Sequence, residues 1–206
     1  AMAGHLLKAG HDLYVYNRTK SKADRLVEAG AIWCDDVKSI ATTCDLIFTI
    51  IGVPADVESV YLGEDGLVNH AKAHSILVDM TTSTPDLAKR IYEAGQAKGL
   101  QCLDAPVTGG DVGAKNGTLT IMVGGEKETY DEILPILELM GQTIVYMGSA
   151  GSGQHTKMAN QIAIAGAAIG MVEALAYSKG AGLDLETVLK AVTSGSAASW
   201  QLSNMA

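Results

Sequence analysis

Runs of apolar residues alternate with amphipathic stretches over the first 146 residues of the chain. The runs contain little polar alternation, which is typical of strands buried on both faces, and the stretches between them repeat with helical spacing. The expected strands are residues 12–16, 45–51, 75–79, 100–105, 119–123 and 143–146, and the expected helices are residues 1–9, 20–29, 85–98 and 126–140. Buried strands separated by helices predict an α/β fold with a doubly wound, mainly parallel sheet of Rossmann type.

The pattern changes after residue 153, where no further strand is expected. Residues 155–180 indicate one long helix that is apolar almost all round, residues 185–194 a second helix, and a third begins near Ala198. The glycine- and serine-rich stretch 148–153 (GSAGSG) is typical of a linker. We therefore expect a nucleotide-binding domain over residues 1–150 and the start of an all-α domain over residues 151–206.

The elements expected at both ends of the chain indicate a fold that continues beyond this sequence. A parallel sheet that opens on a helix, here residues 1–9, is expected to have a strand before it. One long apolar helix and two short ones cannot bury each other's faces, so we expect further helices or a partner chain to cover them. The interpretation is a piece of a longer protein that forms a homo-oligomer through its helical domain when complete.

Composition narrows the class of partner. The formal net charge is −8 without a cluster of basic residues, which argues against nucleic acid. The three cysteines have no metal-binding spacing, so we expect no metal and a cytoplasmic protein with reduced thiols. The apolar stretch 158–177 contains Asn160, Gln161 and Glu173, which favours a buried helix over a membrane span.

The end of the second strand of a doubly wound fold meets the adenosine ribose of a dinucleotide. In this chain Asn17, Arg18 and Thr19 follow the strand that ends at Tyr16. An acidic residue there would favour NAD, whereas the guanidinium fork of Arg18 suits a 2′-phosphate. The sequence thus favours NADP, with NAD as the second choice; the alternative is a surface arginine beside a helix cap at Thr19.

Two further segments carry candidate chemistry. Thr108, Gly109 and Gly110 follow an expected strand, and consecutive backbone N–H groups at glycines can bind a carboxylate; the alternative is an ordinary turn. Lys157 begins the long apolar helix with Asn160 and Gln161 one turn further on. A buried lysine has a lowered pKa and suits acid–base catalysis, unless it only extends its amine to solvent.

Together these motifs resemble the β-hydroxyacid dehydrogenase family, which includes 3-hydroxyisobutyrate dehydrogenase, tartronate semialdehyde reductase and glyoxylate/succinic semialdehyde reductase. The resemblance extends over essentially the whole chain. It rests on VYNRT at 15–19, VDMTTSTP at 78–85, DAPVTGG, GAKNGTL and MVGG within 104–125, and GxGxxxKxxN at 151–160.

The resemblance implies a role for each candidate residue. Lys157 would be the catalytic acid and base, and Thr108, Gly109 and Gly110 would hold the substrate carboxylate. Asn160 would orient the substrate, and three residues would line the nicotinamide side of the cofactor site: Gly52, Val53 and Thr82. Two positions depart from the family, because Thr108 replaces a frequent serine and Gln161 replaces a frequent asparagine; either Asn160 or Gln161 makes the substrate contact.

The expected reaction is hydride transfer between NADP(H) and a small 3-hydroxy acid, or the matching semialdehyde or glyoxylate. A 6-phosphogluconate-dehydrogenase-like enzyme is an alternative, which the run 115–119 (KNGTL) disfavours. An imine-reductase-like enzyme is another, but those enzymes generally lack the lysine. The alternative from a different class is a non-catalytic nucleotide-binding module, which the retention of Lys157 disfavours.

Overall fold

The computed structural model describes residues 1–205 and contains the expected alternation of strands and helices. The first part comprises α1 (Met2–Lys8), β1 (Tyr14–Val15), η1 (Lys20–Ala23), α2 (Asp24–Glu28), β2 (Ile32–Trp33), α3 (Val37–Thr43), β3 (Leu46–Thr49), α4 (Pro54–Leu62), α5 (Leu67–His70), β4 (Ile76–Asp79) and α6 (Pro85–Gln96). The second part comprises β5 (Gln101–Asp104), β6 (Val107–Thr108), α7 (Gly110–Asn116), β7 (Leu119–Gly124), α8 (Lys127–Leu137), β8 (Gly141–Gly148), α9 (Ser152–Gly180), α10 (Leu185–Thr193) and α11 (Trp200–Asn204).

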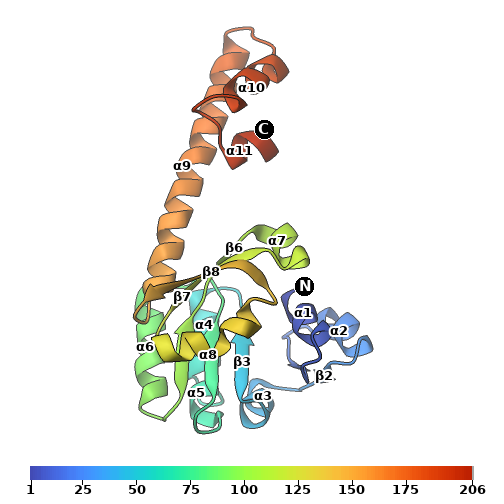
Figure 1. Ribbon diagram of the computed structural model, residues 1–206, viewed down its shortest axis with the longest axis vertical. Helices are drawn as coiled ribbons and strands as arrows, with labels where there is room; N and C mark the ends of the chain where they lie inside the picture. Colours follow the sequence, from blue (N-terminus) through green and yellow to red (C-terminus); the bar gives the residue numbers. More distant parts are fainter. Residues whose placement is uncertain (206) are drawn as a thin grey trace. The chain divides into compact units, whose positions relative to one another are not determined.

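The strands form two sheets, which Figure 1 shows together with the helices around them. Strands β1 and β2 pair with each other in parallel. The other six form a sheet in which β3, β4 and β5 are parallel neighbours. Strand β7 runs antiparallel to β5 and β6 and parallel to β8. The sheet is therefore mainly parallel, as expected, with a local reversal at β7.

Helices cover both faces of the six-stranded sheet, and strand β4 shows why residues 76–78 are all apolar. Leu77 packs on one face in a buried cluster with residues of α3, α4, α5 and α6. Ile76 and Val78 pack on the other face in a cluster with residues of α1 and α8. Because every residue of β4 is buried, polar alternation along the strand is not possible.

Several elements differ from the sequence-based expectation. The stretch expected as one helix over 20–29 is a short 3₁₀ helix, η1, followed by α2. The pattern gave no sign of β2, α3, α4, α5, β6 or α7, most of which are short. Short elements contain too few residues for a repeat of 2 or 3.6 to stand out.

The chain divides into two compact units, residues 1–157 and residues 158–206. The division lies within α9; the domain boundary that the sequence placed near residue 150 stays a prediction.

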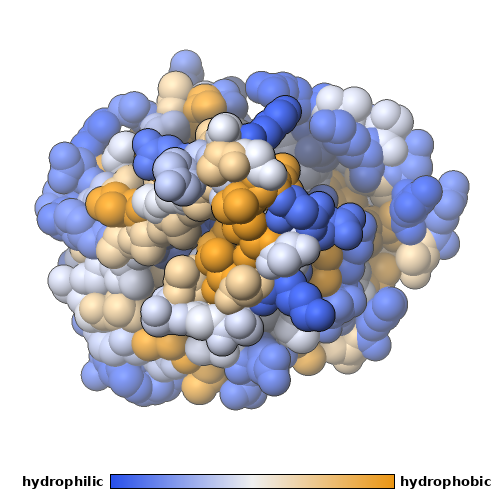
Figure 2. Space-filling model, turned by 90° about the horizontal axis from the view of Figure 1, so that it is seen from above, coloured by the Kyte–Doolittle hydropathy of each residue, from blue (hydrophilic) through white to orange (hydrophobic). Residues whose placement is uncertain are grey.

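Helix α9 is long and apolar enough to cross a membrane by length and composition alone. Within residues 1–205 only 6% of its most apolar stretch is buried, so burial of this helix by further helices or a partner chain stays a prediction. Ile162, Ile169 and Tyr177 are exposed along it, and hydrophobic groups (orange) reach the surface in the view from above in Figure 2. The helix thus presents apolar surface that residues 1–205 leave uncovered.

Candidate functional site

The candidate site lies at the edge of the sheet where the parallel strands end. Thr49 of β3 is in register with Asp79 of β4, and Asp79 is in register with Asp104 of β5. The loops that follow these three strands therefore leave the sheet side by side. In open α/β sheets, ligands bind beyond this carboxyl edge.

A buried network orders the first two of these loops. The Asp79 carboxylate accepts hydrogen bonds from the Thr49 hydroxyl (2.9 Å) and from the backbone N–H of Thr81 (3.1 Å). The Thr49 hydroxyl also bonds the Tyr61 hydroxyl at 2.7 Å. The Thr81 hydroxyl accepts a bond from the backbone N–H of Ile51 at 2.9 Å, which ties the loop after β3 to the loop after β4.

Burial raises the pKa of Asp79, and its bonds with Thr81 and Thr49 act against that rise. Gly52, Val53 and Thr82, the residues predicted to line the nicotinamide, lie in the two tied loops and are exposed. The structure therefore brings these predicted cofactor residues together on one surface.

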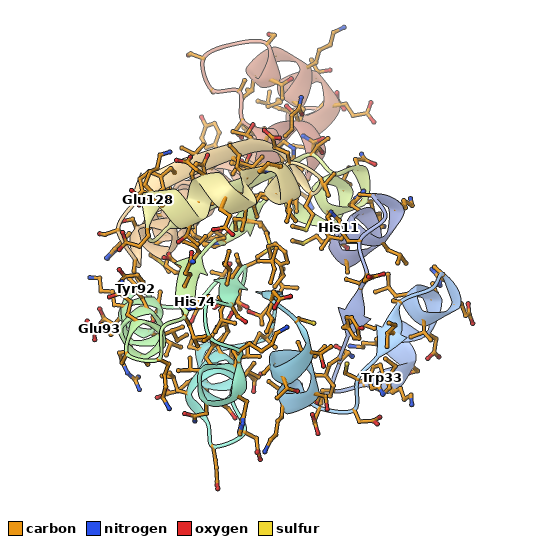
Figure 3. All side chains as sticks on the ribbon, turned by 60° about the horizontal axis from the view of Figure 1, so that its bottom comes forward. His11, Trp33, His74, Tyr92, Glu93 and Glu128 are labelled. Atoms are coloured by element: carbon orange, nitrogen blue, oxygen red, sulfur yellow. The ribbon has the colours of Figure 1, made fainter. Side chains whose placement is uncertain are left out.

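The segment predicted to meet the adenosine ribose follows β1. Trp33, labelled in Figure 3, supports it: its ring lies 6.0 Å from that of Tyr16 and 5.0 Å from the Lys20 amine. The Asn17 side chain donates to the backbone oxygen of Thr19 at 2.7 Å, which leaves the neighbouring Arg18 pointing outward.

The Arg18 side chain is 87% exposed and lies 4.0 Å from Asp56 in the first turn of α4. This contact places the loop after β1 beside the loop after β3. The residues predicted for the two ends of a dinucleotide therefore share one edge of the fold. Such an arrangement fits a nicotinamide dinucleotide.

The predicted carboxylate turn follows β6. Gly109 and Gly110 have φ angles of 127° and 60°, which favour glycine strongly. Both glycines are exposed, and Thr108 is half-buried beside them. The backbone groups of this turn are consequently open to a ligand.

Asp104 anchors the start of α9. Its two carboxylate oxygens accept the backbone N–H groups of Gly151 (2.7 Å) and Gln154 (2.8 Å). Burial raises the pKa of Asp104, and these backbone bonds act against the rise. A Cβ on Gly153 would lie 2.7 Å from the Asp104 backbone oxygen, so glycine is required for this close approach.

Gln154 links the same helix start to the loop after β4. Its side chain donates to the backbone oxygen of Thr81 at 2.7 Å and accepts the backbone N–H of Ser83 at 2.9 Å. Gln154 is completely buried. Sequence reasoning assigned no role to Asp104 or Gln154, although an acid that ends an otherwise apolar strand was a usable signal.

Lys157 lies one turn beyond this anchor and is only 7% exposed. Burial lowers the pKa of its amine. Within residues 1–205 the amine makes no ion pair that would fix its charge. A desolvated amine without a carboxylate partner is suited to exchange a proton with a ligand.

Asn160 and Gln161 follow Lys157 on α9 and belong to the second compact unit. The Asn160 side-chain nitrogen donates to the Gln161 side-chain oxygen at 3.0 Å. The structure therefore brings these two predicted substrate residues together. In the described part of the chain no cluster of three metal-binding side chains occurs.

Comparison with known families agrees with this geometry. Residues 1–148 match the family described as the NAD binding domain of 6-phosphogluconate dehydrogenase. Residues 151–206 match the family described as the NAD-binding domain of NADP-dependent 3-hydroxyisobutyrate dehydrogenase. The second match includes α9, which is thus part of a known dehydrogenase domain.

Individual relatives of the chain are also named as oxidoreductases or dehydrogenases. The chain is 56% identical over its whole length to the uncharacterized oxidoreductase YkwC of Bacillus subtilis, of which it covers 72%. It is 46% identical, over 97% of its length, to the probable 3-hydroxyisobutyrate dehydrogenase-like 1 of Arabidopsis thaliana, of which it covers 60%. The chain thus spans between 60% and 72% of these two relatives.

Among solved structures, the 3-hydroxyisobutyrate dehydrogenase of Mycobacterium tuberculosis with L-serine aligns with a TM-score of 0.89 at 25% identity. The alignment covers 99% of this chain and 69% of that one.

The chain belongs to the β-hydroxyacid dehydrogenase family of NAD(P)-dependent oxidoreductases. Its sheet is accordingly a nucleotide-binding Rossmann-type sheet, followed by helices of the second family domain.

Proposed function

We propose that the complete protein transfers hydride between NADP(H) and a short 3-hydroxy acid, or the matching semialdehyde or glyoxylate. The single observation that supports this most is Lys157, which is buried, has no ion-pair partner in the described residues, and is held next to the carboxyl edge of the sheet. The family match supplies the class of reaction.

The nicotinamide cofactor supplies the hydride acceptor or donor when it is bound. Gly52, Val53 and Thr82 would contact its nicotinamide half. Asn17, Arg18 and Thr19 would contact its adenosine half, with the Arg18 guanidinium on the 2′-phosphate. The exposure of Arg18 and the description of the second family as NADP-dependent both support NADP over NAD.

Substrate binding would use the turn at Thr108, Gly109 and Gly110, whose backbone N–H groups suit a carboxylate. Asn160 and Gln161 lie three and four residues after Lys157 on the same helix, so all three share one face of α9. We propose that one of the two carboxamides orients the substrate hydroxyl beside the Lys157 amine.

Proton transfer is the part of the reaction assigned to Lys157. In reduction, the Lys157 ammonium donates a proton to the oxygen of the forming alkoxide. In oxidation, the neutral amine accepts the proton of the substrate hydroxyl as hydride leaves the same carbon. A lowered pKa increases the fraction of neutral amine near neutral pH, which favours the second direction.

The family context supports a small carboxylate as substrate. The similar M. tuberculosis structure holds L-serine, and a Pseudomonas aeruginosa relative with 36% identity is named an NAD-dependent L-serine dehydrogenase. We further propose a cytoplasmic homo-oligomer, in which the exposed apolar residues of α9 pack against other helices.

A substrate panel tests the proposal. The full-length protein is assayed with 3-hydroxyisobutyrate, serine, glyoxylate, succinic semialdehyde and 2-hydroxy-3-oxopropionate, each with NADP(H) and NAD(H). We expect turnover of at least one of these acids and a higher kcat/KM with NADP(H). Absence of turnover with every pair would contradict the enzyme assignment and favour a nucleotide-binding module.

A further inference from the structure

The first turn of α9 is fixed by two polar side chains that the proposed reaction does not use directly. Asp104 holds the backbone N–H groups of Gly151 and Gln154, and the Gln154 carboxamide holds the backbone of Thr81 and Ser83. All five residues are buried.

These bonds form a continuous path between the parts of the candidate site. The path begins at the Asp79 carboxylate, which binds the backbone N–H of Thr81. It continues from the backbone oxygen of Thr81 through the Gln154 side chain, and from the Gln154 backbone to Asp104. The loop of the cofactor residue Thr82 is thus joined to the helix of Lys157 by a single carboxamide.

Gln154 precedes Lys157 by three residues, less than one turn of helix. A shift of Gln154 against the loop after β4 therefore moves Lys157 by a similar amount relative to that loop. Hydride transfer and proton transfer act on one carbon and its oxygen, so the loop and the amine must keep a fixed separation.

The chemistry of the contact explains why the residue is glutamine. The backbone oxygen of Thr81 requires a donor, and the backbone N–H of Ser83 requires an acceptor. A carboxamide supplies both from one side chain. A carboxylate would place an oxygen against the Thr81 oxygen and a second charge beside the buried Asp104.

We propose that Gln154 is a positioning residue that sets the location of the Lys157 amine relative to the nicotinamide loop. The inference rests on the proposed function, in which Lys157 exchanges the proton. Gln154 then touches neither substrate nor cofactor and acts only through the start of α9.

The test uses Gln154→Leu and Gln154→Glu in the full-length protein. Without the two hydrogen bonds from the Gln154 side chain to the backbone of residues 81 and 83, the start of α9 loosens and water reaches the Lys157 amine. We expect kcat to fall by about tenfold to a hundredfold with little change in cofactor affinity, because misplacement of about 1 Å has this effect. The acidic limb of the pH profile for oxidation, on which the rate rises as the amine loses its proton, should move upward by about one unit as desolvation is relieved.

A second readout needs no substrate. The pH dependence of Lys157 labelling by an amine-reactive reagent, followed by peptide mass spectrometry, reports the pKa of the amine itself. We expect the same upward shift in Gln154→Leu. In Gln154→Glu the added carboxylate also raises the pKa of Lys157 by its charge, so the labelling curve is read in Gln154→Leu. Failure of the proposed function would appear as absence of turnover in the unaltered protein, whereas failure of this inference would appear as an unchanged labelling curve in Gln154→Leu.

The matched control is Gln101→Leu. Gln101 accepts a hydrogen bond from Thr129 at 2.6 Å at the opposite end of β5, so the same substitution removes a comparable bond away from the site. We expect a normal pH profile and labelling curve in this variant. A folded Gln154→Leu protein with unchanged kcat and an unchanged Lys157 labelling curve would overturn the proposal. If Gln154→Leu does not fold, kcat of Gln154→Glu for oxidation, measured at a pH where the amine is fully deprotonated, decides, and an unchanged value would overturn the proposal.

Discussion

Removal of the Lys157 amine is the perturbation that reaches the proposed chemistry most directly. Lys157→Ala deletes the proton donor and acceptor, and Lys157→Met deletes the amine while it keeps an apolar stem in the buried position. General acid–base catalysis contributes about 10²–10⁴-fold, so we expect kcat to fall by at least that factor in both variants. The corresponding loss of transition-state stabilisation is about 3–5 kcal/mol.

The structure separates this effect from a loss of folding. Lys157 is 7% exposed and has no ion-pair partner among residues 1–205, so its charged form is destabilised by burial. Replacing it with an apolar side chain removes a desolvation cost and breaks no ion pair within residues 1–205. We therefore expect an unchanged or higher melting temperature together with the large loss in kcat.

The assay is steady-state oxidation and reduction by the full-length protein across pH, with cofactor affinity measured separately by fluorescence titration. In the unaltered protein, oxidation should require one deprotonated group, with a pKa below that of an ordinary lysine because burial lowers the pKa of Lys157. Oxidation rises as pH passes this value, and reduction falls. Both dependences should disappear in Lys157→Met.

Two controls sharpen the result. Lys157→Arg keeps the charge but cannot release a proton near neutral pH, so it should restore little activity. Lys179→Ala removes an exposed lysine from the far end of the same helix and should behave as the unaltered protein. Near-normal kcat in Lys157→Ala would refute the reasoning and make Lys157 a structural lysine that only reaches solvent.

Three further predictions concern the cofactor and the helix anchor. Arg18→Ala should weaken NADPH by about one to two orders of magnitude in titrations, since charge-assisted bonds contribute about 1.5–3 kcal/mol, and should spare NADH; equal losses would contradict NADP selection. Asp56→Asn removes the carboxylate 4.0 Å from Arg18 and should tighten NADPH by at most about fivefold, because exposed ion pairs contribute about 0.2–1 kcal/mol; weaker binding would mean that Asp56 orders the loop instead. Asp104→Asn sets an amide nitrogen against a backbone N–H and should lower the free energy of unfolding by about 1–3 kcal/mol. Calorimetry should then show a melting temperature lower by several degrees, and an unchanged melting temperature would show that Asp104 does not hold α9.

The sequence predicted the central strands because burial on both faces removes polar alternation. Strand β4 is the clearest case, with Leu77 on one face and Val78 on the other. Helix α6 was predicted almost to its ends, because Thr84 caps it and Pro85 begins it. Short elements such as β2 and α5 contain no full repeat, and the sequence gave no sign of them.

The candidate site was predictable where chemistry is carried by local motifs. The glycine turn after Thr108 and the lysine at the start of α9 can both be recognised from neighbouring residues. The anchor of α9 cannot, because Asp104 binds Gly151 across 47 residues and Gln154 binds Thr81 across 73. Contacts of this separation depend on the folded sheet and leave no periodic trace in the chain.

The division of the strands into two sheets affects how this stretch of chain behaves during refolding. Strand β1 pairs only with β2, and β3 pairs only with β4, so within residues 1–205 one side of each has no strand beside it. An unpaired strand edge accepts any extended segment, including one from another copy of the same chain. Correct folding is first order in chain concentration and such pairing is at least second order, so the yield of monomeric protein from this stretch should rise steeply as refolding is diluted.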